Sequence, residues 1–306
     1  MQVKHNRQNP NTEEYIRSCE GRFESEITEA ADMVKSLPSI EIVAFSGPSS
    51  SGKTTASKRL KEKIEASDPQ ADRAFRRVHS VSIDDFFKPA RDVAPKVTKS
   101  GVTLPDFESA NALDLDDFET FVRGIEYGKT LSYRTYDFKT RDRGETESFY
   151  FAPSDIIIFE GIQANYPEVT EILSCRKMCR IYISVEGSLE SAGEIFSGDE
   201  IRLMRRIVRD SVHRNSDAAN TLFLWEGVRE NEISNIEPYI TDCDFSINSM
   251  LEYEIGVLKP RLLPLISKLD GGYGKIAADL EARLSGTNEL PASLVPAGSI
   301  LREFID

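Results

Sequence analysis

The chain lacks any long hydrophobic run. Its apolar stretches fall well short of the ~20 residues that a membrane-spanning helix needs. Residues 1–20 are polar where a secretory signal carries an apolar core. We therefore expect no membrane partner and a cytoplasmic protein.

Positive charge is scarce as well. The 306 residues include 38 Lys and Arg against 51 Asp and Glu, which gives a formal net charge of -13. A general nucleic-acid-binding protein shows a basic surface instead. We expect a small-molecule substrate and no nucleic-acid partner, although a local basic patch can still bind phosphate in such a chain.

Cysteine is too sparse for a disulfide framework. The four cysteines are scattered, and only Cys175 and Cys179 lie near one another, with no second Cys or His pair to complete a zinc site. Free thiols in a reducing compartment are the favoured interpretation.

Short apolar runs alternate with helix-like segments. Such alternation is typical of a mostly parallel sheet that is covered on both faces. Residues 85–113 and 128–150 interrupt it, and we expect irregular structure there. The strand candidates are 40–46, 78–83, 155–160, 179–185 and 244–249, and the helix candidates are 11–36, 53–67, 114–127, 167–175, 200–213, 217–233 and 252–267.

GPSSSGKT, from Gly47 to Thr54, fits the pattern G-x-x-x-x-G-K-[ST] between a strand candidate and a helix candidate. Its glycines let backbone amides face an anion, and the start of the helix adds its positive end. In this pattern the lysine reaches the β- and γ-phosphates and the next hydroxyl binds Mg²⁺. A serine-rich turn without a ligand is the alternative. We expect ATP to be bound by Gly47, Ser49, Ser50, Ser51, Gly52, Lys53, Thr54 and Thr55, with Thr54 also on the metal.

Other elements separate the classes of nucleotide-binding protein. The guanine-specifying N-K-x-D of GTPases is absent. A motor ATPase usually has a strand that ends in paired acids, whereas 155–160 ends in one, Glu160. A small-molecule kinase instead needs a carboxylate beside the acceptor hydroxyl and cations around the transferred group.

Both requirements of a kinase are visible in the sequence. Asp84 and Asp85 follow the second strand candidate, at the sheet edge where ligands bind in open α/β sheets. The helix candidate at 200–213 concentrates arginine, which indicates a phosphate clamp or lid. A solvated helix face is the alternative for the arginines, and a turn cap is the alternative for Asp84. The arginines are Arg202, Arg205, Arg206 and Arg209, followed by Arg214.

Together these motifs resemble the uridine–cytidine kinase branch of the phosphoribulokinase/uridine kinase family of P-loop kinases. The likeness runs from about residue 40 to 260, through the phosphate loop, SIDDFF, YDFKTRDR, IIIFEGI and RLMRRIVRDSVHR. It implies that Asp84 is the catalytic base, with Phe87 where a tyrosine is common. It also implies a metal near Glu160, nucleoside contacts from Tyr136 and Phe138, and phosphate or substrate contacts from Arg206, Arg209 and Arg214.

The chain departs from the family pattern at positions that contact the nucleoside in that family. Arg141 replaces a histidine that contacts the pyrimidine, and Glu108 stands where the family has an aspartate that holds the ribose hydroxyls. RNSD replaces R-G-R-D at the end of the lid, and EGSLESAGEIFSGDE is an insertion before the arginine helix. Simple strand-core roles for Tyr136 and Phe138, and a position for Glu160 without metal contact, are further alternatives.

We predict an α/β protein with the three-layer α/β/α fold of P-loop NTPases, an Arg-rich lid helix and a helical N-terminal extension. The expected segments are 1–38, a kinase domain at 39–268, and 269–306 packing on that domain; a homo-oligomer is left open. The predicted reaction is ATP- and Mg²⁺-dependent phosphorylation of a hydroxyl, with the 5′-hydroxyl of uridine or cytidine as acceptor in pyrimidine salvage. Lys53, Asp84, Arg206 and Arg209 are the predicted catalytic residues.

Three other functions remain open. One is a kinase of another small hydroxyl compound, such as a sugar phosphate or pantothenate. A second is a non-catalytic nucleotide-binding regulator, which would need neither Asp84 nor a full set of lid arginines. The third is a nucleic-acid-linked NTPase, which the net charge of -13 disfavours.

Overall fold

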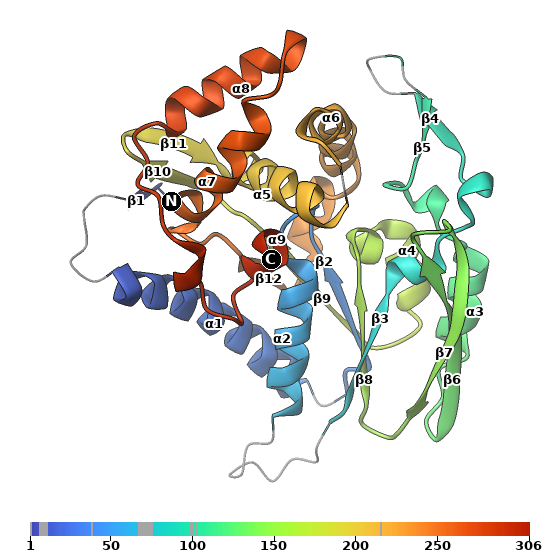
Figure 1. Ribbon diagram of the computed structural model, residues 1–306. Helices are drawn as coiled ribbons and strands as arrows, with labels where there is room; N and C mark the ends of the chain where they lie inside the picture. Colours follow the sequence, from blue (N-terminus) through green and yellow to red (C-terminus); the bar gives the residue numbers. More distant parts are fainter. Residues whose placement is uncertain are drawn as a thin grey trace.

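The protein is shown in Figure 1 as a computed structural model that describes residues 2–5, 12–37, 39–66, 76–97, 101, 103–214 and 216–306. Its central sheet has five strands in the order β12–β9–β2–β8–β3, and every neighbouring pair is parallel. The strands are β2 (Ile42–Ser46), β3 (Val78–Ser82), β8 (Ile156–Glu160), β9 (Met178–Ser184) and β12 (Phe245–Asn248). All five match strand candidates from the sequence.

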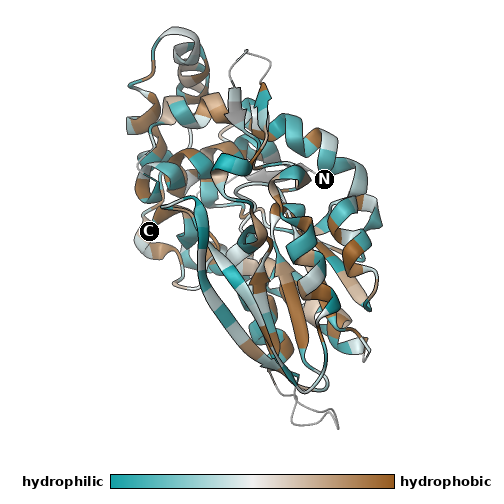
Figure 2. Cartoon of the chain, turned by 90° about the vertical axis from the view of Figure 1, so that its right-hand side faces the viewer, coloured by the Kyte–Doolittle hydropathy of each residue, from teal (hydrophilic) through white to brown (hydrophobic). Residues whose placement is uncertain are grey.

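The sequence of β2 explains why both faces of the sheet are covered. Val43 and Phe45 belong to one hydrophobic cluster, and Ile42 and Ala44 belong to another. Alternate side chains of a strand point to opposite faces, so an apolar run of this kind needs packing partners on both. Figure 2 shows the central strands as hydrophobic and the outer helices as mixed in hydropathy. The predicted α/β/α layering is confirmed.

The helices divide between the two faces. Residues of α1 (Thr12–Ser36), α2 (Lys53–Glu65), α5 (Gly198–His213) and α7 (Glu254–Ile266) lie in the cluster that contains Val43. The other cluster includes residues of α3 (Leu115–Arg123) and α4 (Pro167–Leu173). With α6 (Ala218–Asn235), these helices confirm the predicted set to within a few residues; positions 11 and 67 of the predicted ranges lie outside the described residues.

Several elements were not predicted. Strands β6 (Lys129–Asp137) and β7 (Asp142–Phe151) form a long antiparallel hairpin where we expected irregular structure. The insertion before the arginine helix holds a second hairpin, and 269–306 contains a full helix. Polar residues on the exposed faces of β6–β7 hid its strand character, while Leu131, Tyr133 and Tyr136 are buried. The second hairpin is β10 (Ser188–Ser191) and β11 (Glu194–Ser197), and the helix is α8 (Gly271–Leu284).

Short strands and a short helix lie in other parts of the chain. Strand β1 (Gln2–His5) pairs in parallel with β10, and β4 (Pro95–Val97) pairs with β5 (Thr103–Pro105) in the segment expected to be irregular. The terminal helix α9 (Arg302–Ile305) returns to the middle of the molecule (Figure 1). In the part of the chain that the structure describes, no helix is both long and apolar enough to cross a membrane.

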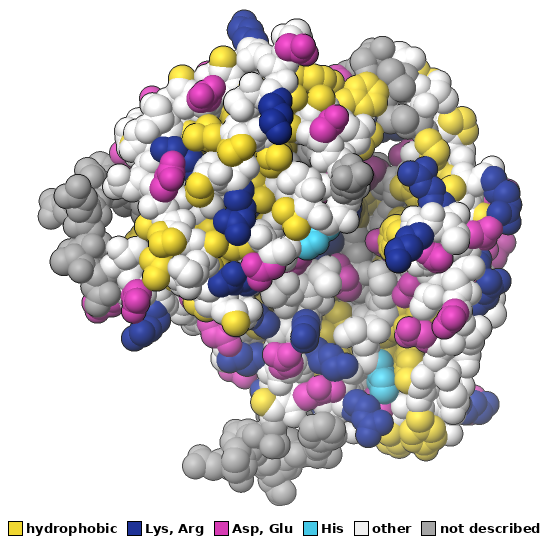
Figure 3. Space-filling view, in the orientation of Figure 1, with side chains coloured by type: hydrophobic (Ala, Val, Ile, Leu, Met, Phe, Trp, Pro, Cys, Tyr) yellow, Lys and Arg dark blue, Asp and Glu magenta, His cyan; other side chains and the backbone are white. Residues whose placement is uncertain are grey.

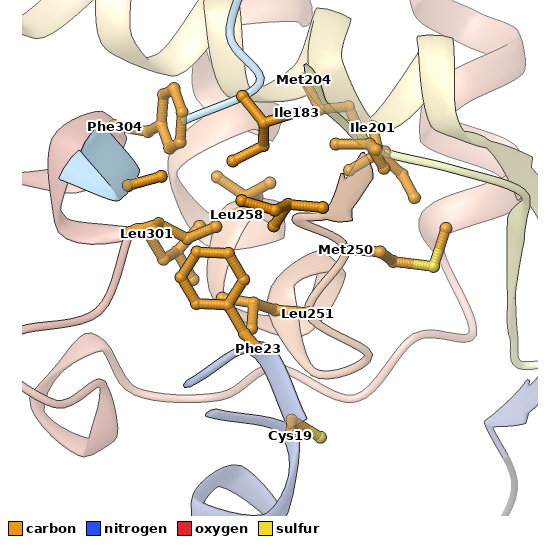
Figure 4. Close-up of a cluster of buried hydrophobic side chains, with 14 of the residues drawn as sticks. Cys19, Phe23, Ile183, Ile201, Met204, Met250, Leu251, Leu258, Leu301 and Phe304 are labelled. Carbon is orange, nitrogen blue, oxygen red and sulfur yellow. The ribbon is translucent and has the colours of Figure 1, made fainter. Parts of the chain in front are cut away.

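Both ends of the chain contribute to the main core. Phe23 of α1, Ile183 of β9 and Phe304 of α9 are fully buried in one cluster, which Figure 4 shows in close-up. The predicted extensions at 1–38 and 269–306 therefore share a hydrophobic core with the sheet.

Candidate active site

The loop between β2 and α2 has the backbone of an anion-binding turn. Gly52 has φ 87° and Ser50 has φ 62°, both in the left-handed region. Gly47 is required by close approach, since a Cβ there would lie 2.1 Å from the carbonyl oxygen of Ile183. The loop follows the middle strand of the sheet and leads directly into the N-terminus of α2. The backbone amides of the turn and the positive end of the α2 dipole thus point to the same position, where an anion can bind.

Two hydroxyls of this loop are buried without a bond. Ser50 Oγ and Ser51 Oγ have no hydrogen-bond partner among the described residues. Buried polar groups in folded proteins are rarely left unsatisfied, and those that are require an explanation. A bound phosphate would accept from both, so the loop fits the nucleotide that the sequence predicts.

Arg202 of α5 supports the loop from behind. Its guanidinium is buried, pairs with both oxygens of Glu232 at 2.6 and 2.8 Å, and donates to the carbonyl of Ser49 at 3.1 Å. The bidentate pair fixes the guanidinium plane. Arg202 therefore holds the outer side of the loop and does not face the phosphate position.

Arg205 acts in the same way one position along the loop. It is fully buried against Glu254, with contacts of 2.6 and 2.9 Å, and donates to the carbonyl of Ser50 at 3.3 Å. The arginine helix is thus mostly buried rather than an exposed lid. Its start is fixed by a capping box between Ser197 and Glu200.

The other three arginines gather around one carboxylate. Arg206 donates to Ser49 Oγ at 2.8 Å and lies 3.4 Å from Asp210. Arg209 and Arg214 approach Asp210 at 2.8 and 3.6 Å. Three cations therefore share the single carboxylate of Asp210, which cannot neutralise all of them, and a phosphate clamp requires such charge. Asn215, in the altered lid end, lies outside the described residues.

Lys53 is the cation at the centre of the loop. Its Nζ donates to the carbonyl of Pro48 at 3.0 Å. Burial lowers the pKa of Lys53, and the negative charges of Glu160, Glu303 and Asp84 oppose that shift. The charges of carboxylates from three separate elements therefore act on the ammonium.

Asp84 lies two residues beyond β3, in a short 3₁₀ helix (Ile83–Phe86) whose start is capped because Ser82 Oγ accepts from the Asp84 amide. Burial and the charge of Glu160 raise the pKa of Asp84 to about 7, against the opposing charge of Lys53. A carboxylate that titrates near neutral pH is suited to accept a proton from a hydroxyl.

Asp85 points elsewhere. Its Oδ1 accepts from the backbone amide of Tyr136 at 3.0 Å, which joins the turn after β3 to β6. Arg143 donates to its carbonyl at 2.9 Å. Asp85 therefore has a structural position, in contrast to its neighbour.

Two predicted metal ligands lie near Lys53. Thr54 is exposed at the start of α2, and Glu160 ends β8, where burial raises its pKa and Lys53 opposes that rise. No group of three His, Cys, Asp or Glu side chains forms a metal cage in the described ranges. Mg²⁺ in kinases is held by one or two protein oxygens together with substrate phosphates, so this pair fits.

Glu108 faces the arginines across the site. Burial raises its pKa, and the charges of Arg206 and Lys53 oppose the rise. Its backbone carbonyl accepts from Tyr166 Oη at 3.0 Å, and Asn231 Nδ2 of α6 donates to that hydroxyl at 2.7 Å. These two bonds tie the backbone at Glu108 to α6 through Tyr166.

Phe87, Phe107, Tyr136 and Phe138 form an aromatic group next to Glu108. Phe87 packs edge-on against Phe107 and Tyr136, with ring centroids 5.3 and 5.5 Å apart, and Tyr136 contacts Phe138 at 5.1 Å. Phe138 is 63% exposed, whereas the buried hydroxyl of Tyr136 has no partner among the described residues. Arg141 is exposed with φ 54°.

The surface is open at this place. Figure 3 shows it hollowed between α6 and the β4–β5 hairpin, with charged side chains of both signs around the hollow. Lys96 of β4 and Glu230 of α6 face each other at 3.9 Å. An ion pair thus connects the two elements that flank the hollow.

The sequence analysis missed two residues of this region. Glu303 of α9 accepts from Thr55 Oγ1 at 2.9 Å, although 248 positions separate the two residues. Phe107 completes the aromatic group. The sequence around Glu303 carries no motif, whereas Phe107 directly precedes Glu108 and could have been selected with it.

Comparisons with known proteins indicate the family of this chain. The model of the phosphoribulokinase / uridine kinase family matches residues 42–255. The chain is 26% identical over 185 residues to uridine-cytidine kinase B of Dictyostelium discoideum, which covers 60% of this chain and 64% of that protein. It is 24% identical over 241 residues to a uridine kinase of Brevibacillus brevis, with 78% and 89% covered.

The chain thus spans less than two thirds of the Dictyostelium protein, and 37% of a Saccharomyces cerevisiae uridine kinase to which it is 23% identical. Among solved structures, a candidate fructose transport system kinase from Silicibacter sp. TM1040 is similar with a TM-score of 0.51 at 15% identity. The match covers 72% of this chain and 98% of that one. This likeness concerns the fold alone.

Proposed function

This chain belongs to the phosphoribulokinase/uridine kinase family, and from that premise we propose that it transfers the γ-phosphoryl group of ATP to a small-molecule hydroxyl, in particular the 5′-hydroxyl of uridine or cytidine. The observation that carries the proposal is that Lys53 follows β2 and Asp84 follows β3 at the same edge of the parallel sheet, where their charges shift each other's pKa. It supports a phosphate cation and a proton acceptor in one site.

In the proposed reaction Asp84 accepts the proton of the acceptor hydroxyl as the oxygen attacks the γ-phosphorus. The new oxygen–phosphorus bond forms while the bond between the γ-phosphorus and the β–γ bridging oxygen breaks, and ADP leaves. Lys53, Arg206 and Arg209 offset the charge on the phosphoryl oxygens. Thr54 and Glu160 would hold Mg²⁺, which would supply further neutralisation of phosphate charge.

Glu108 and the nearby aromatic residues support a nucleoside as the phosphoryl acceptor. A carboxylate can accept hydrogen bonds from both hydroxyls of a ribose diol. The exposed ring of Phe138, next to Tyr136, can pack against a pyrimidine with its edge or its face. Arg141 then reads or rejects substituents of the base, and Arg214 contacts substrate or phosphate. We propose that residues 39–268 form the catalytic unit and that 269–306 supports it.

ADP release measured against a panel of nucleosides, sugar phosphates and pantothenate tests the proposal. We expect acceptor-dependent turnover with uridine or cytidine, and Lys53→Ala should lower that turnover by about 10²-fold or more, because the phosphate cation is lost. Turnover only with a non-nucleoside alcohol would move the assignment to another hydroxyl kinase. ATP binding without any acceptor-dependent turnover would leave a regulator.

Glu108→Gln is expected to raise the KM for the nucleoside by about tenfold, while the KM for ATP changes little. A neutral amide accepts weaker hydrogen bonds from a diol than a carboxylate does. The same measurement with 2′-deoxyuridine provides the control, because the substitution should matter less when one hydroxyl is missing. An equal effect on both nucleosides would argue against contact between Glu108 and the ribose.

A further inference from the structure

The terminal helix α9 places a carboxylate on donors of the phosphate loop. Glu303 Oε2 accepts from Thr55 Oγ1 at 2.9 Å and from the Thr55 amide at 3.3 Å. That amide lies in the first turn of α2, where backbone N–H groups have no partner inside the helix. Thr55 is also one of the residues expected to bind nucleotide phosphate. A protein carboxylate therefore occupies an anion position of this loop.

The segment that carries Glu303 is firmly anchored. Ile300, Leu301 and Phe304 are fully buried, and the Phe304 ring lies 5.2 Å from the guanidinium of Arg205. Figure 4 shows Leu301 and Phe304 in the core with Ile183. A Cβ added to Gly52 would lie 3.5 Å from Ile300, so the segment directly backs the loop. Only the Glu303 side chain, which is partly exposed, needs to rotate for Thr55 to become available.

The charge of Glu303 also acts on groups that a nucleotide would meet. It favours the charged form of Lys53 and disfavours that of Glu160. A phosphate oxygen at Thr55 would lie beside the Glu303 carboxylate, and two anions at hydrogen-bond distance of one donor pair repel strongly. Phosphate and carboxylate therefore exclude each other at this position.

We propose that Glu303 is a built-in anionic competitor of the nucleotide phosphates at Thr55. The carboxylate satisfies Thr55 while the loop is empty and moves away when a nucleotide binds. This competition lowers the affinity of the loop for ATP and ADP and favours release of product. The inference rests on the proposed function, because it requires that a nucleotide binds this loop.

Calorimetric titration of wild-type protein and of Glu303→Gln with ATP and with inorganic tripolyphosphate tests the inference. Glutamine keeps the length and an acceptor oxygen but lacks the charge. We expect Glu303→Gln to bind both ligands about fivefold to tenfold more tightly, because a charge-assisted contact no longer has to be broken. Thermal melting of the variant verifies that it is folded.

Asp306→Asn is the matched control. Asp306 directly follows the same short helix and pairs with Arg302 at 2.8 Å, so the substitution removes one negative charge beside α9 without changing a partner of Thr55. We expect the Kd of this variant for both ligands to stay within about twofold of wild type. If the Kd fell by the same factor in both variants, the effect would come from net charge alone, and the inference would be overturned.

The outcomes separate the inference from the proposed function. If wild type binds ATP and Glu303→Gln binds it equally or more weakly, Glu303 supports the loop rather than competing, and only the inference fails. If neither protein binds ATP or tripolyphosphate, the proposed function and the inference fail together. Binding by Glu303→Gln alone would be the strongest form of the expected result.

Discussion

Asp84→Asn is expected to lower kcat by about 10²- to 10⁴-fold, the range by which general base catalysis accelerates a reaction. Asparagine has nearly the same shape but cannot accept the hydroxyl proton. The Kd for ATP should remain nearly unchanged, because the loop keeps Lys53 and its backbone amides. Acceptor-dependent ADP release and direct ATP titration measure the two quantities.

Asp85→Asn is the control for that substitution. Asp85 is adjacent, yet its carboxylate accepts from the Tyr136 amide at 3.0 Å, and an asparagine oxygen can still accept there. We expect kcat to stay within about threefold of wild type, since only the charge assistance of one structural bond is lost. Comparable losses in the two variants would contradict the assignment of Asp84 as the base.

The pKa of Asp84 also predicts a pH dependence. Burial and Glu160 raise this pKa from 3.8 to about 7, Lys53 opposes the shift, and Glu108 and Asp85 add to it. Only the ionised form can act as a base, so kcat/KM with both substrates far below saturation should fall about tenfold per pH unit below 7 and level off above it. A profile that is flat between pH 5.5 and 8 would contradict a base with this pKa.

The same shift affects stability. Because the folded state binds the Asp84 proton more tightly than the unfolded state, this residue's contribution to the free energy of unfolding falls as the pH rises from about 4 to 7. Asp84→Asn should therefore be more stable than wild type at pH 8 and nearly equal to it at pH 4. Denaturant unfolding at the two pH values measures the difference.

Arg205→Leu is expected to lower the free energy of unfolding by about 3–5 kcal/mol, the cost of leaving one member of a buried ion pair without its partner. Arg205 and Glu254 are both fully buried, and their contacts are 2.6 and 2.9 Å long. The carbonyl of Ser50 also loses a donor. ATP affinity should fall as well, because the loop loses its support. Denaturant unfolding and ATP titration check both effects.

Arg214→Leu, at the position directly after the same helix, is the matched control. Its side chain is 59% exposed and lies 3.6 Å from Asp210, so we expect the free energy of unfolding to change by about 0.5 kcal/mol or less. The double variant Arg205→Leu/Glu254→Leu should recover part of the lost stability, because no charge is left buried. If Arg205→Leu were as stable as Arg214→Leu, the buried pair would not be the support that the structure indicates.

The sequence by itself determined the parts of the protein that depend on local rules. Strand, glycine turn and helix follow one another between Ile42 and Glu65, and the alternation of apolar runs with helices fixes the parallel sheet. Lys53 and Asp84 could be selected because the carboxyl ends of parallel strands meet at one edge. These predictions need only the order of the residues, the spacing of the apolar positions and the backbone conformations that each residue type prefers.

Tertiary structure alone decided how similar residues divide their roles. Five arginines within thirteen positions look equivalent in sequence, yet Arg202 and Arg205 support loop carbonyls from a buried position while Arg206 faces Glu108. The sequence already favours different roles for Asp84 and Asp85, but only the fold supplies the Tyr136 amide as the structural partner of Asp85. Glu303 reaches Thr55 across 248 positions, and no local pattern encodes a contact that arises when distant segments pack into one core.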